Sequence, residues 1–121
     1  MKKILLLLTI LVGSLTHLSA QSLSNIDFVG HWTANDERVS TEIVFWKDKL
    51  GDFQMVSWDK SDGEMLEISN LKVINNTLTV TTRNKSTNWV IYRTFILIDE
   101  NNLKETIKGD TNTKIYWKKL K

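Results

Sequence analysis

Apolar and polar residues alternate along most of the chain after residue 20, with the two-residue period of β-strands. In Thr77-Leu78-Thr79-Val80-Thr81-Thr82, for example, the apolar side chains occupy alternate positions. Short polar stretches rich in Asn, Asp and Gly separate these segments, and such residues suit tight turns. The pattern predicts eight strands, at residues 28–33, 41–47, 53–59, 65–74, 77–83, 89–98, 103–108 and 113–120.

Eight short strands joined by short links predict an antiparallel up-and-down meander. An open sheet of this kind would expose two strand edges, and closing it into a barrel removes both. We therefore expect an all-β chain folded as a small closed barrel, with a two-sheet sandwich as the competing closure. A barrel of eight strands is wide enough either to be filled by side chains or to hold one small ligand.

The segment 65–74 departs from simple alternation. Leu66 and Ile68 lie on one face of the expected strand, whereas Leu71 and Val73 lie on the other. One extra residue in the strand would reconcile the two halves, so we predict a β-bulge near Ser69-Asn70. After residue 20 there is no helical period of helix length, although a short turn at 22–26 is compatible with the pattern.

The first twenty residues have the three-part plan of a secretory signal peptide. Lys2 and Lys3 are followed by an apolar run over residues 4–12 and then by small and polar residues up to Ala20. A run of about nine residues is short beside the roughly 20 of a membrane-spanning helix, although an uncleaved anchor is the alternative. We expect cleavage after Ala20, a single barrel domain at 21–121, and a secreted or periplasmic location. No cysteine follows the run, so a lipoprotein anchor is excluded.

Removal of the predicted signal peptide changes the charge of the protein. The chain of 121 residues has a formal net charge of +2, and Lys2 and Lys3 account for it. The remaining 14 Lys and Arg balance 14 Asp and Glu, so we expect no general attraction to nucleic acid. The chain has no Cys, which excludes disulfides and thiol chemistry and leaves stability to packing and strand pairing.

The first predicted strand contains Phe28-Val29-Gly30-His31-Trp32. This Gly-x-Trp resembles the signature of the lipocalins and, more broadly, of the calycin barrels, above all the compact bacterial lipocalin-like domains. The resemblance implies that Gly30 lets the chain cross close to the barrel floor and that Trp32 plugs that end. In lipocalins an arginine of the last strand lies over this tryptophan. Here that strand reads Ile115-Tyr116-Trp117-Lys118-Lys119 and carries lysine instead, so the resemblance assigns structural roles to Gly30, Trp32, Trp117 and Lys118.

Catalytic motifs are missing from the sequence. His31 is the single histidine after residue 20, and it lies on the face of its strand opposite Trp32. No Ser/His/Asp signature, phosphate-binding loop or metal-ligand spacing accompanies it. We therefore expect a protein that is not an enzyme and that uses no cofactor or metal.

Arg93 is the most informative charged residue. It lies in the middle of an expected strand and shares a face with Trp89 and Phe95. If that face is interior, the cation needs a buried partner such as Glu67, Glu105 or a ligand carboxylate. If the face is exterior, the side chain extends to water.

Aromatic residues supply the other candidate ligand contacts. Trp46 and Trp58 lie opposite in phase to Phe45 and Phe53, so one pair should face inward and the other outward. An outward pair of tryptophans would mark a sugar-binding or protein-binding patch. The candidate ligand-binding residues are therefore Arg93, Trp89, Phe95, Trp58 and Trp46.

Two functions follow from these observations. The first is an exported, non-catalytic protein that binds a small apolar or amphipathic ligand in a barrel cavity. The alternative is an exported protein-interaction module or inhibitor whose barrel is filled by side chains. An interior void of several hundred Å³ would favour ligand binding, whereas a filled core with outward tryptophans would favour the alternative. Neither function involves nucleic acid or a membrane span.

Overall fold

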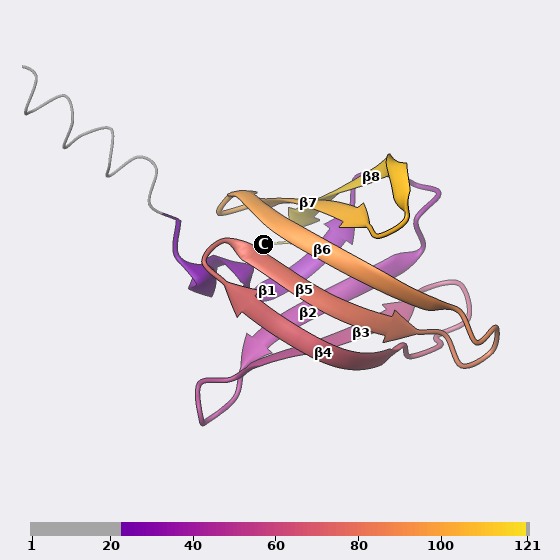
Figure 1. Cartoon of the computed structure of the whole chain (residues 1–121), viewed down its shortest axis with the longest axis horizontal. Coiled ribbons are helices and arrows are strands. Elements are labelled where there is room, and N and C mark those ends of the chain that lie inside the picture. Colours follow the sequence, from indigo (N-terminus) through magenta and orange to yellow (C-terminus); the bar gives the residue numbers. More distant parts are fainter. Residues whose placement is uncertain (1–22, 121) are drawn as a thin grey trace, which may run out of the picture.

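A computed structural model describes residues 23–120 and contains the eight strands that alternation predicts. A short 3₁₀ helix precedes them (Figure 1). The elements are η1 (Asn25–Phe28), β1 (Gly30–Ala34), β2 (Thr41–Lys47), β3 (Phe53–Asp59), β4 (Glu67–Ile74), β5 (Thr77–Arg83), β6 (Val90–Asp99), β7 (Asn102–Ile107) and β8 (Asp110–Lys119). The predicted signal peptide lies outside the described residues.

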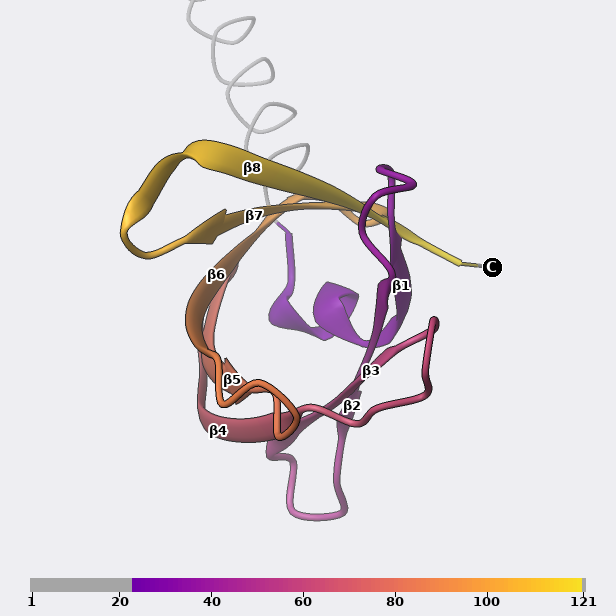
Figure 2. The same ribbon diagram turned by 90° about the vertical axis from the view of Figure 1, so that its right-hand side faces the viewer.

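The strands form one antiparallel sheet in the order β3-β2-β1-β8-β7-β6-β5-β4. Pairing of β1 with β8 brings the two ends of the meander together, as the view along the barrel shows (Figure 2). Between β3 and β4 a single bridge, Trp58 with Met65, replaces a full ladder. A hydrogen bond of 2.9 Å from the Leu66 amide to the Ser57 carbonyl oxygen supports this seam. The prediction of an eight-stranded antiparallel barrel is therefore confirmed, and the barrel is nearly closed.

The predicted bulge in β4 is also present. The register of β4 against β5 shifts between Ser69 and Lys72. Asn70 within this shift has a φ of 53°, a left-handed conformation that asparagine tolerates better than most residues. The bulge brings both apolar halves of the strand to the same side, because Ile68, Leu71 and Val73 all pack against the core.

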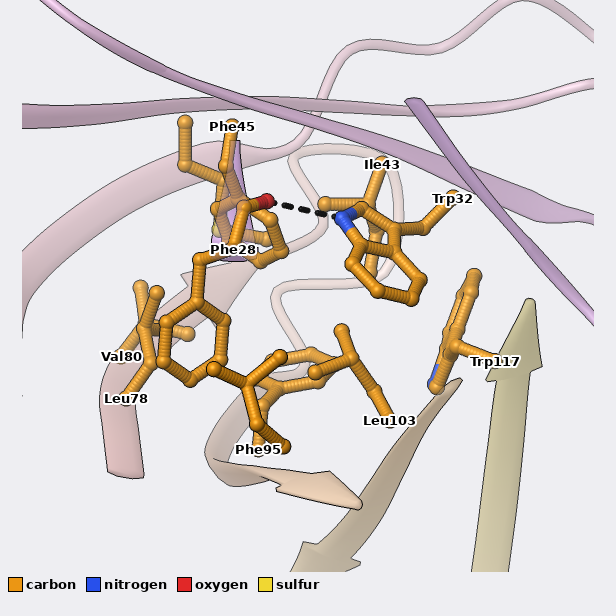
Figure 3. Packing of buried hydrophobic residues seen from close by; sticks show 11 residues of the cluster. Phe28, Trp32, Ile43, Phe45, Leu78, Val80, Phe95, Leu103 and Trp117 are labelled. Atoms are coloured by element: carbon orange, nitrogen blue, oxygen red, sulfur yellow. Dashed lines mark hydrogen bonds between the residues drawn. The ribbon is translucent and has the colours of Figure 1, made fainter. Parts of the chain in front are cut away.

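Alternation along each strand directs one set of side chains into the barrel. The interior set contains large aromatic and aliphatic residues (Figure 3), and its neighbouring aromatic rings pack edge to face. Its buried members are Phe28, Trp32, Ile43, Phe45, Met55, Leu78, Val80, Phe95, Leu97, Leu103 and Trp117. They fill the half of the lumen next to η1, so the core is packed like an ordinary protein interior there.

Helix η1 closes one end of the barrel. It lies across the lumen (Figure 2), and Phe28 at its end is fully buried against Phe45 and Phe53. Ser24 caps the helix, since its hydroxyl accepts a hydrogen bond from the Ile26 amide. Phe28 thus belongs to the helix, and β1 begins at Gly30 rather than at residue 28.

Trp32 completes this closed end. Its ring is fully buried, and Nε1 donates a hydrogen bond of 2.8 Å to the carbonyl oxygen of Phe28. Gly30 has a φ of 146°, and a Cβ there would lie 3.2 Å from the side chain of Lys119. The atoms nearest to Gly30 belong to the side chain of Lys119, and the crossing of the barrel floor that the lipocalin resemblance implies stays a prediction.

The lysine over Trp32 is Lys119, and Lys118 is exposed on the outer wall. Nζ of Lys119 lies 5.0 Å from the Trp32 ring centre and donates a hydrogen bond of 2.7 Å to the Asp27 carbonyl oxygen. The register between β1 and β8 determines which lysine lies over Trp32. Lys119 is the direct cross-strand partner of Trp32 and has the same inward phase as Trp117. The structural role expected of Lys118 is corrected to Lys119.

Candidate ligand-binding site

The barrel holds a cavity at the end opposite η1. Its volume is about 130 Å³, and it is formed where β2, β5 and β6 begin or end. Apolar side chains make up much of its wall, namely Val39, Leu66, Ile91, Ile107 and Ile115. Its polar lining consists of Thr41, Asp59, Thr82, Asn84, Arg93 and Glu105. The site therefore combines an aliphatic wall with several polar and charged groups, and small-molecule sites also join apolar walls to polar groups that orient a ligand.

Arg93 lies inside the barrel and is paired with Glu105, one of the partners considered from the sequence. Its Nε donates to Oε2 of Glu105 at 2.7 Å, and its Nη2 donates to Oε1 at 3.0 Å. The exposed fractions of the two side chains are only 7% and 1%. Such a two-pronged, charge-assisted pair compensates for much of the cost of burying two charges.

Aromatic rings support this ion pair from below. The indole Nε1 of Trp117 donates a hydrogen bond of 2.9 Å to Oε1 of Glu105. The guanidinium carbon of Arg93 lies 5.1 Å from the Phe95 ring centre and 5.9 Å from that of Trp117. The pair therefore forms the boundary between the filled half of the barrel and the cavity. Glu105 accepts hydrogen bonds from Nε and Nη2 of Arg93, so Nη1 is the guanidinium nitrogen that it does not contact.

Thr82 has an unpartnered polar atom in this cavity. The residue is 1% exposed, and its Oγ1 has no hydrogen-bond partner in the part of the chain that the structure describes. A buried hydroxyl without a partner is costly, by about 1–3 kcal/mol in mutational data. A polar group held in the cavity would relieve this cost.

The mouth of the cavity has a negative charge at its rim. Asp59 is half-buried there, and its carboxylate accepts hydrogen bonds from the Ser61 hydroxyl and amide. These bonds hold the pKa of Asp59 below its ordinary value of 3.8. Since Arg93 and Glu105 cancel, the lining carries a net negative charge.

The other predicted ligand contacts do not reach the cavity. Phe95 is fully buried in the core beneath Arg93. Trp46 and Trp58 face outward, because Phe45 and Phe53 are the pair directed inward. Trp89 is 69% exposed.

Trp89 lies outside the barrel because β6 begins one residue later, at Val90. The preceding Asn88 has a φ of 62°, so the backbone turns there and the alternation that relates Trp89 to Arg93 does not extend to it. The prediction that Trp89 shares a face with Arg93 and Phe95 is therefore wrong. Arg93 and Phe95 do share the interior face of β6.

Thr82 is a site residue that was not among the residues predicted from the sequence. Thr82 has the same phase along β5 as the buried Leu78 and Val80, and this shared phase indicates an inward side chain. A threonine in an otherwise apolar inward series marks a polar group directed into the lumen.

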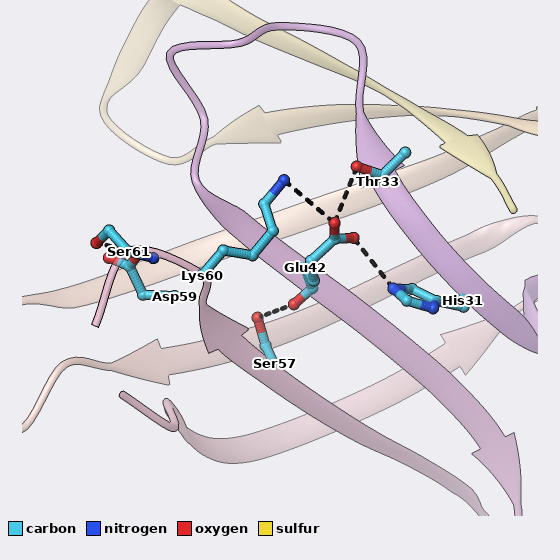
Figure 4. Close-up of polar contacts among 7 residues, drawn as sticks. All are labelled: His31, Thr33, Glu42, Ser57, Asp59, Lys60 and Ser61. Atoms are coloured by element: carbon cyan, nitrogen blue, oxygen red, sulfur yellow. Dashed lines mark hydrogen bonds and ion pairs between the residues drawn. The ribbon is translucent and has the colours of Figure 1, made fainter. Parts of the chain in front are cut away.

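The outer wall carries a separate polar cluster around Glu42 (Figure 4). The Glu42 carboxylate is contacted by Nε2 of His31 at 3.1 Å, by the Thr33 hydroxyl at 3.1 Å and by Nζ of Lys60 at 3.2 Å. The hydroxyl donates to the carboxylate and not to the imidazole, which differs from the order of a hydrolytic triad. The Trp58 ring packs 5.6 Å from that of His31, and the cluster joins β1, β2 and the turn after β3.

The described residues, 23–120, contain no group of three or more His, Cys, Asp or Glu side chains arranged to hold a metal ion. They also contain no helix long and apolar enough to cross a membrane.

Comparison with known proteins adds little to this description. No family model matches the chain, and no curated protein matches it. Among solved structures, the crystal structure of Treponema pallidum Tp0751 (pallilysin) aligns with 93% of this chain and 97% of its own, at 10% sequence identity and a TM-score of 0.49. A similarity of this degree supports no argument about function, and membership of the lipocalins stays a prediction.

Proposed function

We propose that this protein is an exported, non-catalytic binding protein that holds one small amphipathic molecule at the open end of its barrel. The observation that carries the proposal is the buried, unpartnered Oγ1 of Thr82 in a cavity beside Arg93. A ligand hydroxyl, amide or amine could bond to this oxygen while its apolar part contacts the aliphatic wall.

The size of the cavity restricts the ligand. About 130 Å³ is less than the ~300–1,000 Å³ of common ligand pockets. The lumen below Arg93 is filled by Phe95, Trp117 and Leu103, so a long acyl tail has no space inside. This argues against the fatty-acid type of ligand and for a molecule of only a few heavy atoms.

The charge of the cavity also restricts the ligand. Glu105 already accepts hydrogen bonds from Nε and Nη2 of Arg93, and Asp59 adds a second carboxylate at the rim of the cavity. An added anion would therefore meet two negative groups for one cation. A neutral or singly cationic amphipathic molecule fits this arrangement better.

Native mass spectrometry of protein purified from its own host tests the proposal first, by searching for a co-purifying small molecule. Short alcohols, amides and amines can then be titrated while the indole N–H signal of Trp117 is followed by NMR. Thr82→Val should weaken binding of the best of these molecules, and Thr77→Val, an outward change on the same strand, should not. Equal binding by both variants, or no response to any of these molecules, would refute the proposal.

A second candidate function, protein interaction, is supported by the outer wall of β2 and β3. Trp46, Val44, Val56 and Trp58 all lie on this wall, and Trp46 is 40% exposed. Val44 pairs with Val56 across the two strands, whereas Trp46 pairs with Gln54 and Trp58 with Glu42. Together with a mostly filled lumen, this apolar strip is what the interaction-module hypothesis requires. Trp46→Ser should abolish capture of a partner under this hypothesis and leave binding at the cavity unchanged.

A further inference from the structure

Charged residues are unevenly distributed over the barrel surface. Removal of the predicted signal peptide leaves no net charge, yet five lysines lie on or directly beside the outer wall formed by β4 to β8. They are Lys72, Lys104, Lys108, Lys114 and Lys118. No ion pair joins any of them to a carboxylate among the side chains that the structure describes. This wall is therefore a local basic surface on a chain of balanced charge.

A surface hollow of about 390 Å³ lies on this wall. Lys72 on β4 and Lys108 in the turn after β7 line it, and none of its lining residues is Asp or Glu. Asn70, which is exposed at the β4 bulge, contributes an amide to its lining. The bulge thus shapes a recess in a wall that would otherwise be regular.

A row of hydroxyls crosses the hollow. Thr79 pairs with Thr94, and Thr94 pairs with Thr106, so three threonines lie side by side on β5, β6 and β7. The same row continues to Lys72 on β4 and to Lys114 on β8. Hydroxyls therefore recur at the spacing of neighbouring strands, ~4.8 Å, between a lysine at each end.

An aromatic ring lies next to this row. Tyr92 is 54% exposed, pairs with Thr81 across β5 and β6, and lines the hollow. Nζ of Lys108 lies 5.6 Å from the centre of its ring. A cation held over one face of an exposed ring places a charge and an aromatic surface within one small area.

We propose that this hollow binds an acidic saccharide. Sugar hydroxyls would exchange hydrogen bonds with the threonine row and with Asn70, and one sugar ring would stack on Tyr92. Carboxylate or sulfate groups of the same chain would pair with Lys72 and Lys108. The volume of about 390 Å³ lies within the ~300–1,000 Å³ of ordinary ligand sites.

Two other polyanions fit the hollow less well. A membrane surface would touch protruding groups, whereas the threonine row lies in a recess. Single-stranded nucleic acid would need several stacking platforms, and Tyr92 is the only aromatic side chain that lines this hollow. The hydroxyl row between lysines favours a partner that itself carries many hydroxyls.

Isothermal titration with a galacturonate hexamer and a heparin-derived hexamer tests the proposal and separates carboxylate from sulfate recognition. Maltohexaose serves as the neutral control. We expect one acidic hexamer to bind at low salt and maltohexaose to bind far more weakly. The double variant Lys72→Gln/Lys108→Gln should lose at least about tenfold in affinity, and Tyr92→Leu should also lose affinity.

The control variant Lys49→Gln/Lys85→Gln removes two exposed lysines elsewhere and should change affinity by no more than roughly twofold. Circular dichroism of each variant establishes that the barrel is folded. Equal affinity of wild type and the Lys72/Lys108 variant for both acidic hexamers would overturn the proposal. So would binding of a thymidine 12-mer or of phosphatidylglycerol vesicles as tight as that of the saccharides, since the surface would then recognise charge alone.

Discussion

Arg93 and Glu105 form a two-pronged ion pair inside the barrel, with nitrogen–oxygen distances of 2.7 and 3.0 Å. The pair separates an aromatic core from a small cavity, and Trp117 donates a further hydrogen bond to the same carboxylate. Both the packing below it and the proposed ligand site above it therefore depend on one cross-strand contact between β6 and β7.

Removing one member of this pair should cost more than removing the charge from both. Arg93→Met leaves the Glu105 carboxylate buried without its cation, so we expect a loss of ~3–5 kcal/mol in the free energy of unfolding. Arg93→Met/Glu105→Gln removes both charges and keeps an acceptor for Trp117, so it should cost less than the single change. Urea unfolding of the two single variants and the double variant measures this. Additive losses would contradict the pairing.

Lys119 should stabilise the closed end, and its neighbour should not. Lys119→Met removes the ammonium group from the Trp32 ring and from the Asp27 carbonyl oxygen, at a cost of ~1–3 kcal/mol. Lys118→Met, on the outer wall, is the matched control and should change stability by less than ~0.5 kcal/mol. Denaturant midpoints in the opposite order would mean that the register of β8 against β1 is shifted.

Trp32 should be among the most important residues for stability. Trp32→Ala removes a fully buried ring and should cost ~3–5 kcal/mol. Without disulfides, a loss of this size is a large part of the stability of a small domain. Trp32→Phe keeps most of the ring but loses the hydrogen bond to Phe28, so a smaller loss is expected. A midpoint for Trp32→Ala near that of wild type would exclude the plug role.

Acid should weaken the contact between Glu64, which lies between β3 and β4, and Ser86, which lies between β5 and β6. The Glu64 carboxylate accepts hydrogen bonds from the amide and hydroxyl of Ser86, and these lower its pKa from 4.5. A carboxyl group with a lowered folded-state pKa contributes stability above its unfolded pKa, and this contribution is lost as pH falls through the folded value. Stability should therefore fall as the pH drops below about 4.5.

Glu64→Gln should remove part of this acid dependence, since the amide has no proton to gain in this range. Glu100→Gln, a change in the exposed turn between β6 and β7, is the comparison variant. Urea midpoints between pH 7 and pH 3 give the slopes. Identical slopes for wild type and Glu64→Gln would show that the contacts between Glu64 and Ser86 do not contribute to the pH dependence of stability.

Export should remove the first twenty residues. We expect the mature chain to begin at or near Gln21, since the apolar run over residues 4–12 is short and small residues follow it. The intact mass of the exported protein tests this. Leu8→Arg, which interrupts the apolar run, should keep the full-length chain inside the cell. An exported protein that retains residues 1–20 would instead support the anchored form.

The sequence by itself determined the strands, their number and the two faces of each one. Alternation is a local property of the pleated backbone, so it predicted the meander, the bulge at Ser69-Asn70 and the common face of Arg93 and Phe95. It also predicted that Trp46 and Trp58 share one side and Phe45 and Phe53 the other. The pattern did not determine which of the two sides is interior. That choice depends on the interior volume of the whole barrel, and this volume cannot be read from the alternation within one strand.

Tertiary structure decided which residues meet. Register between strands placed Lys119 over Trp32, Glu105 beside Arg93, and the three threonines of the outer wall in one row. Register depends on the geometry of every turn and bulge along the chain, and a shift of one residue changes each of these contacts. The cavity size likewise results from the sum of many side-chain volumes, and so the structure alone revealed a small cavity with apolar and polar lining above a filled core.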